Sequence, residues 1–346
     1  MISLVQTKLK KVILKKELKL AQQDDLYKWS TVQKWQAATD LQSLGQWSQK
    51  QMKNSEEFFS APAAVVNNTN GFIEFDSPIL TSHPENNRAR GRYFQSPKAK
   101  AAVIILGHWN ASEHTYNRLA KIYKLSGISA LRLSLPYHDQ RKPKEMPIAS
   151  GLLSSDLSQT ILGIRQATVD VKVAVDWLHQ RGYEKIGLIG ASLGSSIGLL
   201  SACHDSRINA MVLYLSAADT ADLVWNSSAT QHLRQSFEPD LTLESLRDVW
   251  GCISPSNYLH HLARPNFSMH IGWAHYDTVC PPELTQKMIS TLRDLKVPVS
   301  ESKYRCGHNT LATAPFMQLS GVKGLAFMRK NLKVPRRNAK LAAINN

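Results

Sequence analysis

The middle of the chain alternates between short apolar runs and longer segments with helical periodicity. Residues 71–75 and 90–94 alternate between apolar and polar side chains, as strands with one buried face do. Residues 101–106 are apolar throughout, which is typical of a strand covered on both faces. Further strands are expected at 128–135, 185–189, 210–215, 267–271 and 299–304, with helices at about 114–126, 160–181 and 314–331. This alternation predicts an α/β protein whose central sheet is mostly parallel and carries helices on both faces.

The rhythm breaks between Asp219 and Leu262. The segment is helical in character, contains Trp225 and Trp250, and is too long for a simple connection. Long insertions of this kind often serve as lids or binding elements. We therefore predict a helical lid at 219–262 inside a main domain that spans residues 61–335.

Residues 1–60 show no strand pattern. An imperfect 3.6-residue stripe between lysines consists of Leu9, Val12, Ile13, Lys16 and Leu20. The stripe predicts an amphipathic helix, which either packs on its own domain or rests on an anionic membrane surface through residues 1–20. We interpret residues 1–60 as a basic, polar helical extension and residues 336–346 as a basic, flexible tail.

Composition narrows the class of protein. No stretch approaches the roughly 20 apolar residues of a membrane span, and lysines interrupt the start where a signal peptide needs an apolar core. The net charge of +15 is concentrated in lysines and arginines near both ends, but no RNA- or DNA-binding motif accompanies it, so we expect no nucleic-acid partner. The four cysteines, Cys203, Cys252, Cys280 and Cys306, are widely spaced, as expected of reduced thiols in a cytoplasmic protein without a zinc site.

The strongest chemical signal is the sequence Gly190-Ala191-Ser192-Leu193-Gly194. It follows the predicted strand at 185–189 and precedes a helix of small residues. A serine at so sharp a strand-to-helix turn needs a strained backbone, and the positions two before and two after it must be very small. Both are glycine. The turn would raise the Ser192 hydroxyl above the sheet as a nucleophile and direct the N–H of Leu193 towards a developing oxyanion.

A serine hydroxyl needs a base, and the base needs a carboxylate to orient it. Asp277 and His308 each follow a late strand, in the chain order acid, then histidine, that accompanies this turn. Asp219, which follows the preceding strand, is an alternative acid, although we favour Asp277. His275 is an alternative base, but its place two residues from Asp277 makes it a poor one.

The second oxyanion donor is expected on the loop after residues 101–106. The backbone N–H of Trp109 is our choice, with His108 and Asn110 as candidates for lining the substrate pocket. Tyr137 and Trp225 are further candidates for that pocket.

Several stretches resemble the α/β-hydrolase superfamily, in particular a bacterial subfamily of the dienelactone-hydrolase and acetyl-esterase kind. They are SPILTSHPENNRARGRYF, GHWNASEHTYNRLAKIY, ISALRLSLPYHDQRKP, GASLGSSIG and HYDTVCPPELT, and together they span about residues 71–330. The resemblance implies the α/β-hydrolase fold, a triad of Ser192, Asp277 and His308, and an oxyanion hole at Leu193 and Trp109. The chain departs from its relatives at Gly107-His108, where they usually read His-Gly, and residues 1–60 have no counterpart in the resemblance.

These features predict a serine hydrolase that cleaves an ester-like acyl bond of a small molecule through an acyl-enzyme. A membrane-lipid acyl hydrolase or a thioesterase would use the same residues, because fold and triad do not select the substrate. The alternative from another class is a catalytically inactive hydrolase-fold protein that binds a partner. We expect neither a metal nor an organic cofactor, and a cytoplasmic protein that contacts membranes at most peripherally.

Overall fold

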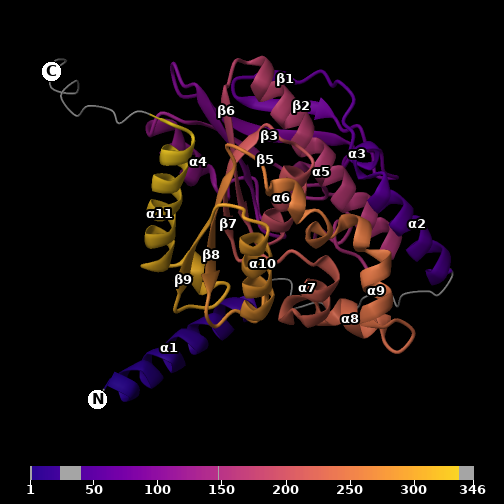
Figure 1. Ribbon diagram of the computed structural model, residues 1–346, viewed down its shortest axis with the longest axis vertical. Helices are drawn as coiled ribbons and strands as arrows, with labels where there is room; N and C mark the ends of the chain where they lie inside the picture. The colour runs from indigo at the N-terminus through magenta and orange to yellow at the C-terminus, as the bar shows by residue number, and fades with distance from the viewer. Residues whose placement is uncertain (1, 24–39, 147, 335–346) are drawn as a thin grey trace.

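The computed structural model describes residues 2–23, 40–146 and 148–334 (Figure 1). At the centre of the described chain lies a nine-stranded sheet in the order β1-β2-β3-β5-β4-β6-β7-β8-β9. The strands are β1 (Asn67–Thr69), β2 (Phe72–Asp76), β3 (Arg88–Phe94), β4 (Ala101–Leu106), β5 (Ser129–Leu133), β6 (Lys185–Ala191), β7 (Ile208–Tyr214), β8 (Ser268–Ala274) and β9 (Val299–Tyr304). The pairs from β1 to β3 and on to β5 are antiparallel, and all later pairs are parallel. The predicted, mostly parallel sheet is therefore confirmed, and only the short edge strand β1 was missed.

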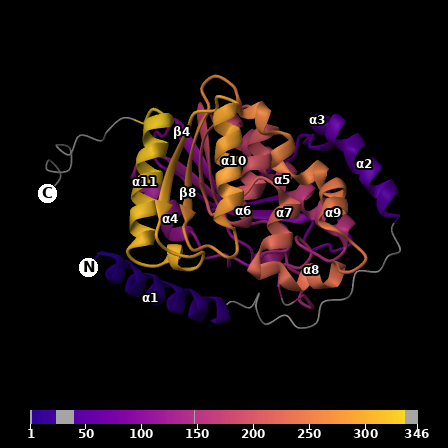
Figure 2. The same cartoon turned by 60° about the horizontal axis from the view of Figure 1, so that its bottom comes forward.

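Helices cover both faces of the sheet (Figures 1 and 2). One face carries α4 (Asn117–Leu125) and α11 (Phe316–Asn331), and the other carries α5 (Leu157–Gln180), α6 (Leu193–Cys203) and α10 (Pro282–Asp294). Strand β4 contributes to both layers: Val103 and Ile105 pack with α4 and α11, whereas Ile104 and Leu106 pack with α5 and α6. This two-sided burial explains its unbroken apolar run.

The segment after β7 forms the predicted helical insertion. It contains α7 (Thr220–Asn226), α8 (Gln231–Phe237), α9 (Leu243–Val249) and short 3-10 turns that end at Leu262. Trp250 is fully buried, and its indole N–H donates to the carbonyl oxygen of Leu157 at 3.2 Å, which ties the insertion to α5.

The N-terminal helices lie at two separate places. Helices α2 (Leu41–Lys53) and α3 (Ser55–Phe58) lie on the insertion side, where the Ser48 hydroxyl accepts from the backbone N–H of Cys252 at 3.0 Å (Figure 2). Helix α1 (Ile2–Gln23) lies instead near the ends of β8 and β9 (Figure 1). The expected tail at 336–346 falls outside the described residues, and a division at residue 61 stays a prediction.

Helix α1 confirms the predicted helix but corrects its buried face. Ile13 is buried against the main domain, yet Val12 of the predicted apolar stripe is 65% exposed. Glu17 is buried in its place. Within the described residues, none of the helices combines the length and the apolarity that a membrane span requires.

Candidate active site

Ser192 occupies a strained turn between β6 and α6. Its φ of 52° and ψ of −121° lie outside the regions that L-residues ordinarily adopt, as predicted for the glycine-flanked serine. A Cβ at Gly190 would lie 2.6 Å from the Cα of Ser195, and one at Gly194 would overlap the carbonyl oxygen of Gly107. Both neighbours must therefore be glycine, and the second contact presses the loop after β4 against the start of α6.

Ser192, His308 and Asp277 form one line of hydrogen bonds. His308 Nε2 lies 3.1 Å from Ser192 Oγ, and His308 Nδ1 lies 2.9 and 3.0 Å from the two carboxylate oxygens of Asp277. Because a carboxylate only accepts, Nδ1 carries the proton and Nε2 is left to accept from the serine hydroxyl. The three residues come from the loops after β6, β9 and β8, so the parallel sheet brings them to one edge.

Backbone N–H groups hold the carboxylate of Asp277 in place beside His308. Its side chain is 1% exposed, and Oδ1 also accepts from the backbone N–H groups of Val279 at 2.9 Å and Cys280 at 2.7 Å. These contacts fix the plane of the carboxylate, which in turn fixes the imidazole of His308.

The alternative acid and base lie in other surroundings. Asp219 caps α7 by accepting from the backbone N–H of Asp222 at 2.9 Å, and it also accepts from the Ser256 hydroxyl at 3.3 Å. Burial raises the pKa of Asp219 above its ordinary value. His275 is exposed at the surface. The structure therefore brings Asp277, and not Asp219, to His308.

The backbone N–H groups of Leu193 and Trp109 are the predicted oxyanion donors, and this role stays a prediction. Leu193 is the first residue of α6, and Trp109 lies on the loop after β4. Neither backbone N–H donates to an acceptor among the described residues. The indole N–H of Trp109 donates to the carbonyl oxygen of Ala149 at 3.0 Å, which anchors this loop.

His138 accepts a hydrogen bond from the loop that carries Trp109, a contact that the sequence analysis missed. The backbone N–H of Asn110 donates to His138 Nε2 at 2.9 Å, and His138 Nδ1 lies 2.8 Å from the carbonyl oxygen of Pro136. Burial lowers the pKa of His138 to about 4, so the ring is neutral at pH 7 and can accept at Nε2. Asn110 has a φ of 61° and accepts at Oδ1 from the backbone N–H of Ala149 at 2.7 Å.

His108 and Tyr137, two further residues predicted for the pocket, each contact another polar side chain. Burial lowers the pKa of His108 to about 4, with smaller effects of His308 and Arg132, and its Nδ1 lies 2.7 Å from the Tyr116 hydroxyl. Tyr137 is fully buried, and its hydroxyl accepts from the amide nitrogen of Gln159 at 3.1 Å. A pocket role for Tyr137 stays a prediction.

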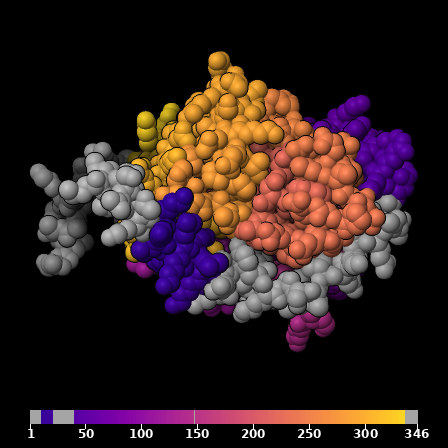
Figure 3. Space-filling view, turned by 90° about the horizontal axis from the view of Figure 1, so that it is seen from below, coloured from indigo at the N-terminus to yellow at the C-terminus, as the bar shows by residue number. Residues whose placement is uncertain are grey.

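The insertion reaches over the loop that carries Trp109. The ring of His232, on α8, stacks on Trp109 with centroids 6.4 Å apart and 18° between the planes. A small apolar cavity of about 20 Å³ between α5, α6 and α7 reaches Leu193, and Leu223 and Val224 of the insertion line it. Trp225 is half-buried, with the Arg234 guanidinium 5.0 Å from its ring centroid. In Figure 3, seen from below, the insertion (darker, reddish orange) and α1 (indigo) both lie on the visible face of the molecule.

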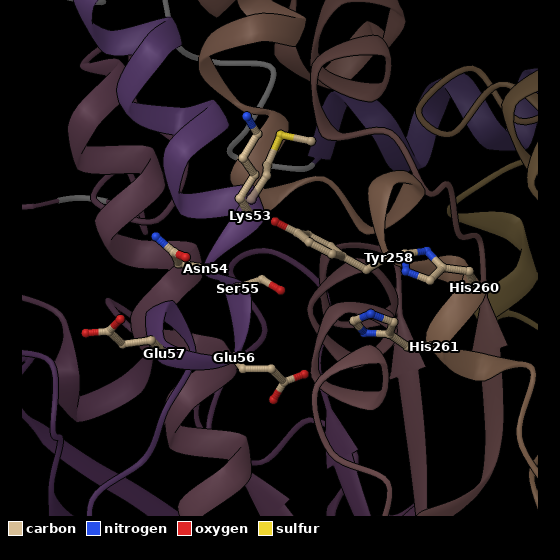
Figure 4. A pocket seen from close by; sticks show the side chains of 9 residues that line it. Lys53, Asn54, Ser55, Glu56, Glu57, Tyr258, His260 and His261 are labelled. Atoms are coloured by element: carbon tan, nitrogen blue, oxygen red, sulfur yellow. The ribbon is translucent and has the colours of Figure 1, made fainter.

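A second cleft lies elsewhere, between α2, α3 and the 3-10 turn Leu259–Leu262 (Figure 4). It has a volume of about 540 Å³ and contains none of the residues around Ser192. His261 lies at this cleft, with Nδ1 2.9 Å from the carbonyl oxygen of Cys203. Across the described residues, no group of three or more His, Cys, Asp or Glu side chains is arranged to hold a metal ion.

Comparison with solved structures defines the class of fold. Acetyl xylan esterase 1 from Thermoanaerobacterium sp. JW/SL YS485 superposes with a TM-score of 0.59 at 14% identity, over 89% of this chain and 98% of the esterase. Acetyl xylan esterase from Paenibacillus sp. R4 gives 0.57 at 13% identity, over 85% and 96% of the two chains. Pyrococcus horikoshii acylaminoacyl peptidase gives 0.56 at 13% identity, over 82% of this chain and 44% of the peptidase. At these identities the likeness concerns the fold, which is that of the α/β hydrolases.

The family follows from the sequence. The chain belongs to the family described as alpha/beta hydrolase domain containing 18, whose model matches residues 15–245. The match begins inside α1, so much of residues 1–60 does have a counterpart in the family, contrary to our expectation. The comparison with curated proteins returns no match.

Proposed function

We propose that this protein is a serine hydrolase that cleaves an ester-like acyl bond of a small molecule. The observation that carries the proposal is the hydrogen-bonded line from Asp277 through His308 to Ser192, beside two backbone N–H groups without acceptors among the described residues. An inactive binding protein has no need of this combination, which favours the enzyme over that alternative.

The geometry supports a two-step reaction. His308 Nε2 takes the proton of Ser192 as Oγ attacks the acyl carbonyl carbon, and the N–H groups of Leu193 and Trp109 stabilise the oxyanion. The intermediate collapses, the alcohol leaves with the proton from His308, and the acyl group stays on Ser192. A water, deprotonated by His308, then attacks this ester, and the free acid leaves as the serine regains its proton.

Apolar side chains lie beside Leu193. The cavity there is small, about 20 Å³, and is lined mostly by aliphatic side chains, including Leu223 and Val224 of the proposed lid. Two of the structural neighbours are acetyl xylan esterases, which agrees with ester chemistry on this fold. Enzymes that cleave thioesters, lactones or peptides use the same catalytic residues, so a panel of acyl substrates must distinguish these activities.

A fluorophosphonate reagent tests the proposal directly. It should label the wild-type protein, and the tryptic peptide that carries the label should contain Ser192, because the activated hydroxyl attacks phosphorus as it attacks an acyl carbon. A protein that stays unlabelled under conditions that label a known serine esterase would favour the inactive binding protein.

We propose that the insertion at 219–262 acts as a lid over the acyl group. If so, Trp225→Ala should change the ratio of kcat/KM between long and short acyl esters by about 10-fold, the value of one or two methylenes in a pocket. Trp47→Ala, on α2 outside the insertion, is the matched control and should leave the ratio unchanged. A lower melting temperature with an unchanged ratio would mean that Trp225 only packs.

A membrane-lipid acyl hydrolase is the second candidate, and the outer face of α1 favours it. Val12 and Leu18 are 65% and 60% exposed, and the exposed lysines Lys11, Lys15 and Lys19 lie on the same side of the helix. Apolar side chains among lysines suit a peripheral contact with anionic lipid, and Figure 3 places α1 at the same end of the molecule as the insertion. We propose a cytoplasmic protein that touches membranes through this face.

Vesicle sedimentation tests the membrane contact. Wild type should pellet with phosphatidylserine vesicles at low salt and be released at high salt, because each basic residue near the surface contributes about 1 kcal/mol. The triple variant Lys11→Gln, Lys15→Gln, Lys19→Gln should stay in the supernatant. The control Lys98→Gln, Lys121→Gln, Lys124→Gln removes the same charge from exposed positions outside α1 and should pellet like wild type. Equal pelleting of both variants would contradict the assignment to α1.

A further inference from the structure

Helix α1 packs against the loop that carries His308. Ile13 lies in a small apolar cluster with Cys306 and Leu311, on either side of the histidine in sequence. Lys16 Nζ donates to the hydroxyl of Thr313 at 2.9 Å. Figures 1 and 2 show the helix beside the ends of β8 and β9, far in sequence from the segment that it touches.

Glu17 makes the most specific of these contacts. Its Oε1 accepts from the backbone N–H of Asn309 at 2.8 Å and from the Asn309 side-chain amide at 3.1 Å. Its Oε2 accepts from the backbone N–H of Thr310 at 2.8 Å. The residue is 7% exposed, and it is the one acidic residue among the first 23 in the sequence. A buried carboxylate with three donors is a site where orientation is strongly defined.

The loop is shaped to receive this carboxyl group. A Cβ at Gly307 would lie 2.5 Å from Glu17 Cδ, so a larger residue at 307 would displace Glu17. The N–H of Gly307 donates to the Thr310 hydroxyl at 2.7 Å, which closes the turn around His308. The residues before and after the histidine are therefore both fixed against Glu17.

We propose that Glu17 is a positioning residue for His308, an inference that rests on the proposed function. The backbone of His308 is held between Gly307 and Asn309, and this hold sets where Nε2 lies relative to Ser192 Oγ. Asp277 fixes the rotation of the ring, and Glu17 fixes the loop from which the ring projects. A misplacement of about 1 Å in a catalytic group can cost up to about 10²-fold in rate.

The proposal predicts a loss in kcat with little change in KM. Glu17→Ala should lower kcat on a soluble short-chain ester by about 10-fold or more, with KM within about two-fold, because Glu17 does not touch the substrate. Glu17→Gln should fall between wild type and Glu17→Ala, since the amide oxygen can still accept one N–H. The rate of fluorophosphonate labelling should fall in parallel with kcat.

Lys16→Gln is the matched control. It removes the neighbouring contact of the same helix, to Thr313, but leaves the Glu17 contacts in place. It should keep the wild-type kcat. An equal loss in Lys16→Gln and Glu17→Ala would overturn the proposal in favour of general helix docking, as would a wild-type kcat in Glu17→Ala. If Glu17→Ala fails to fold, Glu17→Gln decides alone, and a wild-type kcat for it, with wild-type labelling, overturns the proposal.

Ser192→Ala, measured in the same assays, separates this inference from the proposed function. Persistent labelling and activity in Ser192→Ala would overturn the serine mechanism itself. Loss of both in Ser192→Ala, together with a wild-type kcat in the Glu17 variants, would overturn only the role of Glu17.

Discussion

Ser192→Ala should remove essentially all hydrolysis of simple esters, a fall in kcat on the order of 10⁶, because Ser192 is the nucleophile that the proposed acyl-enzyme requires. A residual rate above that in water is expected from the N–H groups of Leu193 and Trp109, which remain available to an oxyanion. The measurement is kcat for p-nitrophenyl acetate, together with fluorophosphonate labelling, which should disappear.

The fold should survive this substitution. Among the described residues, the Ser192 hydroxyl is hydrogen-bonded to His308 Nε2 at 3.1 Å, and alanine tolerates the strained turn about as well as serine. Ser201→Ala is a matched control on α6, because its buried hydroxyl donates only to the carbonyl oxygen of Ile197 within the helix. This control should retain wild-type activity. Undiminished labelling of Ser192→Ala would place the nucleophile elsewhere.

Asp277→Asn should lower kcat by on the order of 10⁴. Oδ1 of Asp277 accepts from the N–H groups of Val279 and Cys280, so an asparagine would keep its oxygen there and turn its NH₂ towards His308 Nδ1. Nδ1 would then have to accept, which moves the ring proton to Nε2. In that tautomer His308 cannot take the proton of Ser192.

Asp219→Asn is the comparison that decides between the two candidate acids. Its carboxylate caps α7, and asparagine is about as good a cap as aspartate, so both stability and kcat should change little. The two variants are assayed side by side on the same p-nitrophenyl ester. A larger loss in Asp219→Asn than in Asp277→Asn would move the acid to the loop after β7.

The predicted strands lie close to the observed ones because their signals are local. The apolar run in β4 and the alternation in β2 reflect which faces of each strand are covered, and that requirement acts on neighbouring residues. The Ser192 turn could also be predicted from the sequence. Gly190 and Gly194 are required by contacts with residues a few positions away and with the loop after β4. Strand β1, of three exposed residues, carries no such pattern and was missed.

The sequence by itself therefore determined the fold class, the strained serine turn and the set of late acidic and histidine candidates. Only the tertiary structure decided which carboxylate meets His308, because Asp219 and Asp277 both follow strands of a parallel sheet. It also decided the buried face of α1, where Glu17 lies inward and Val12 outward. Glu17 and Asn309 are 292 residues apart, and a carboxyl group among lysines resembles a solvated surface until the chain folds. Local periodicity predicts which face of a helix is buried. The contact of Glu17, by contrast, depends on which distant N–H groups the fold leaves without another acceptor.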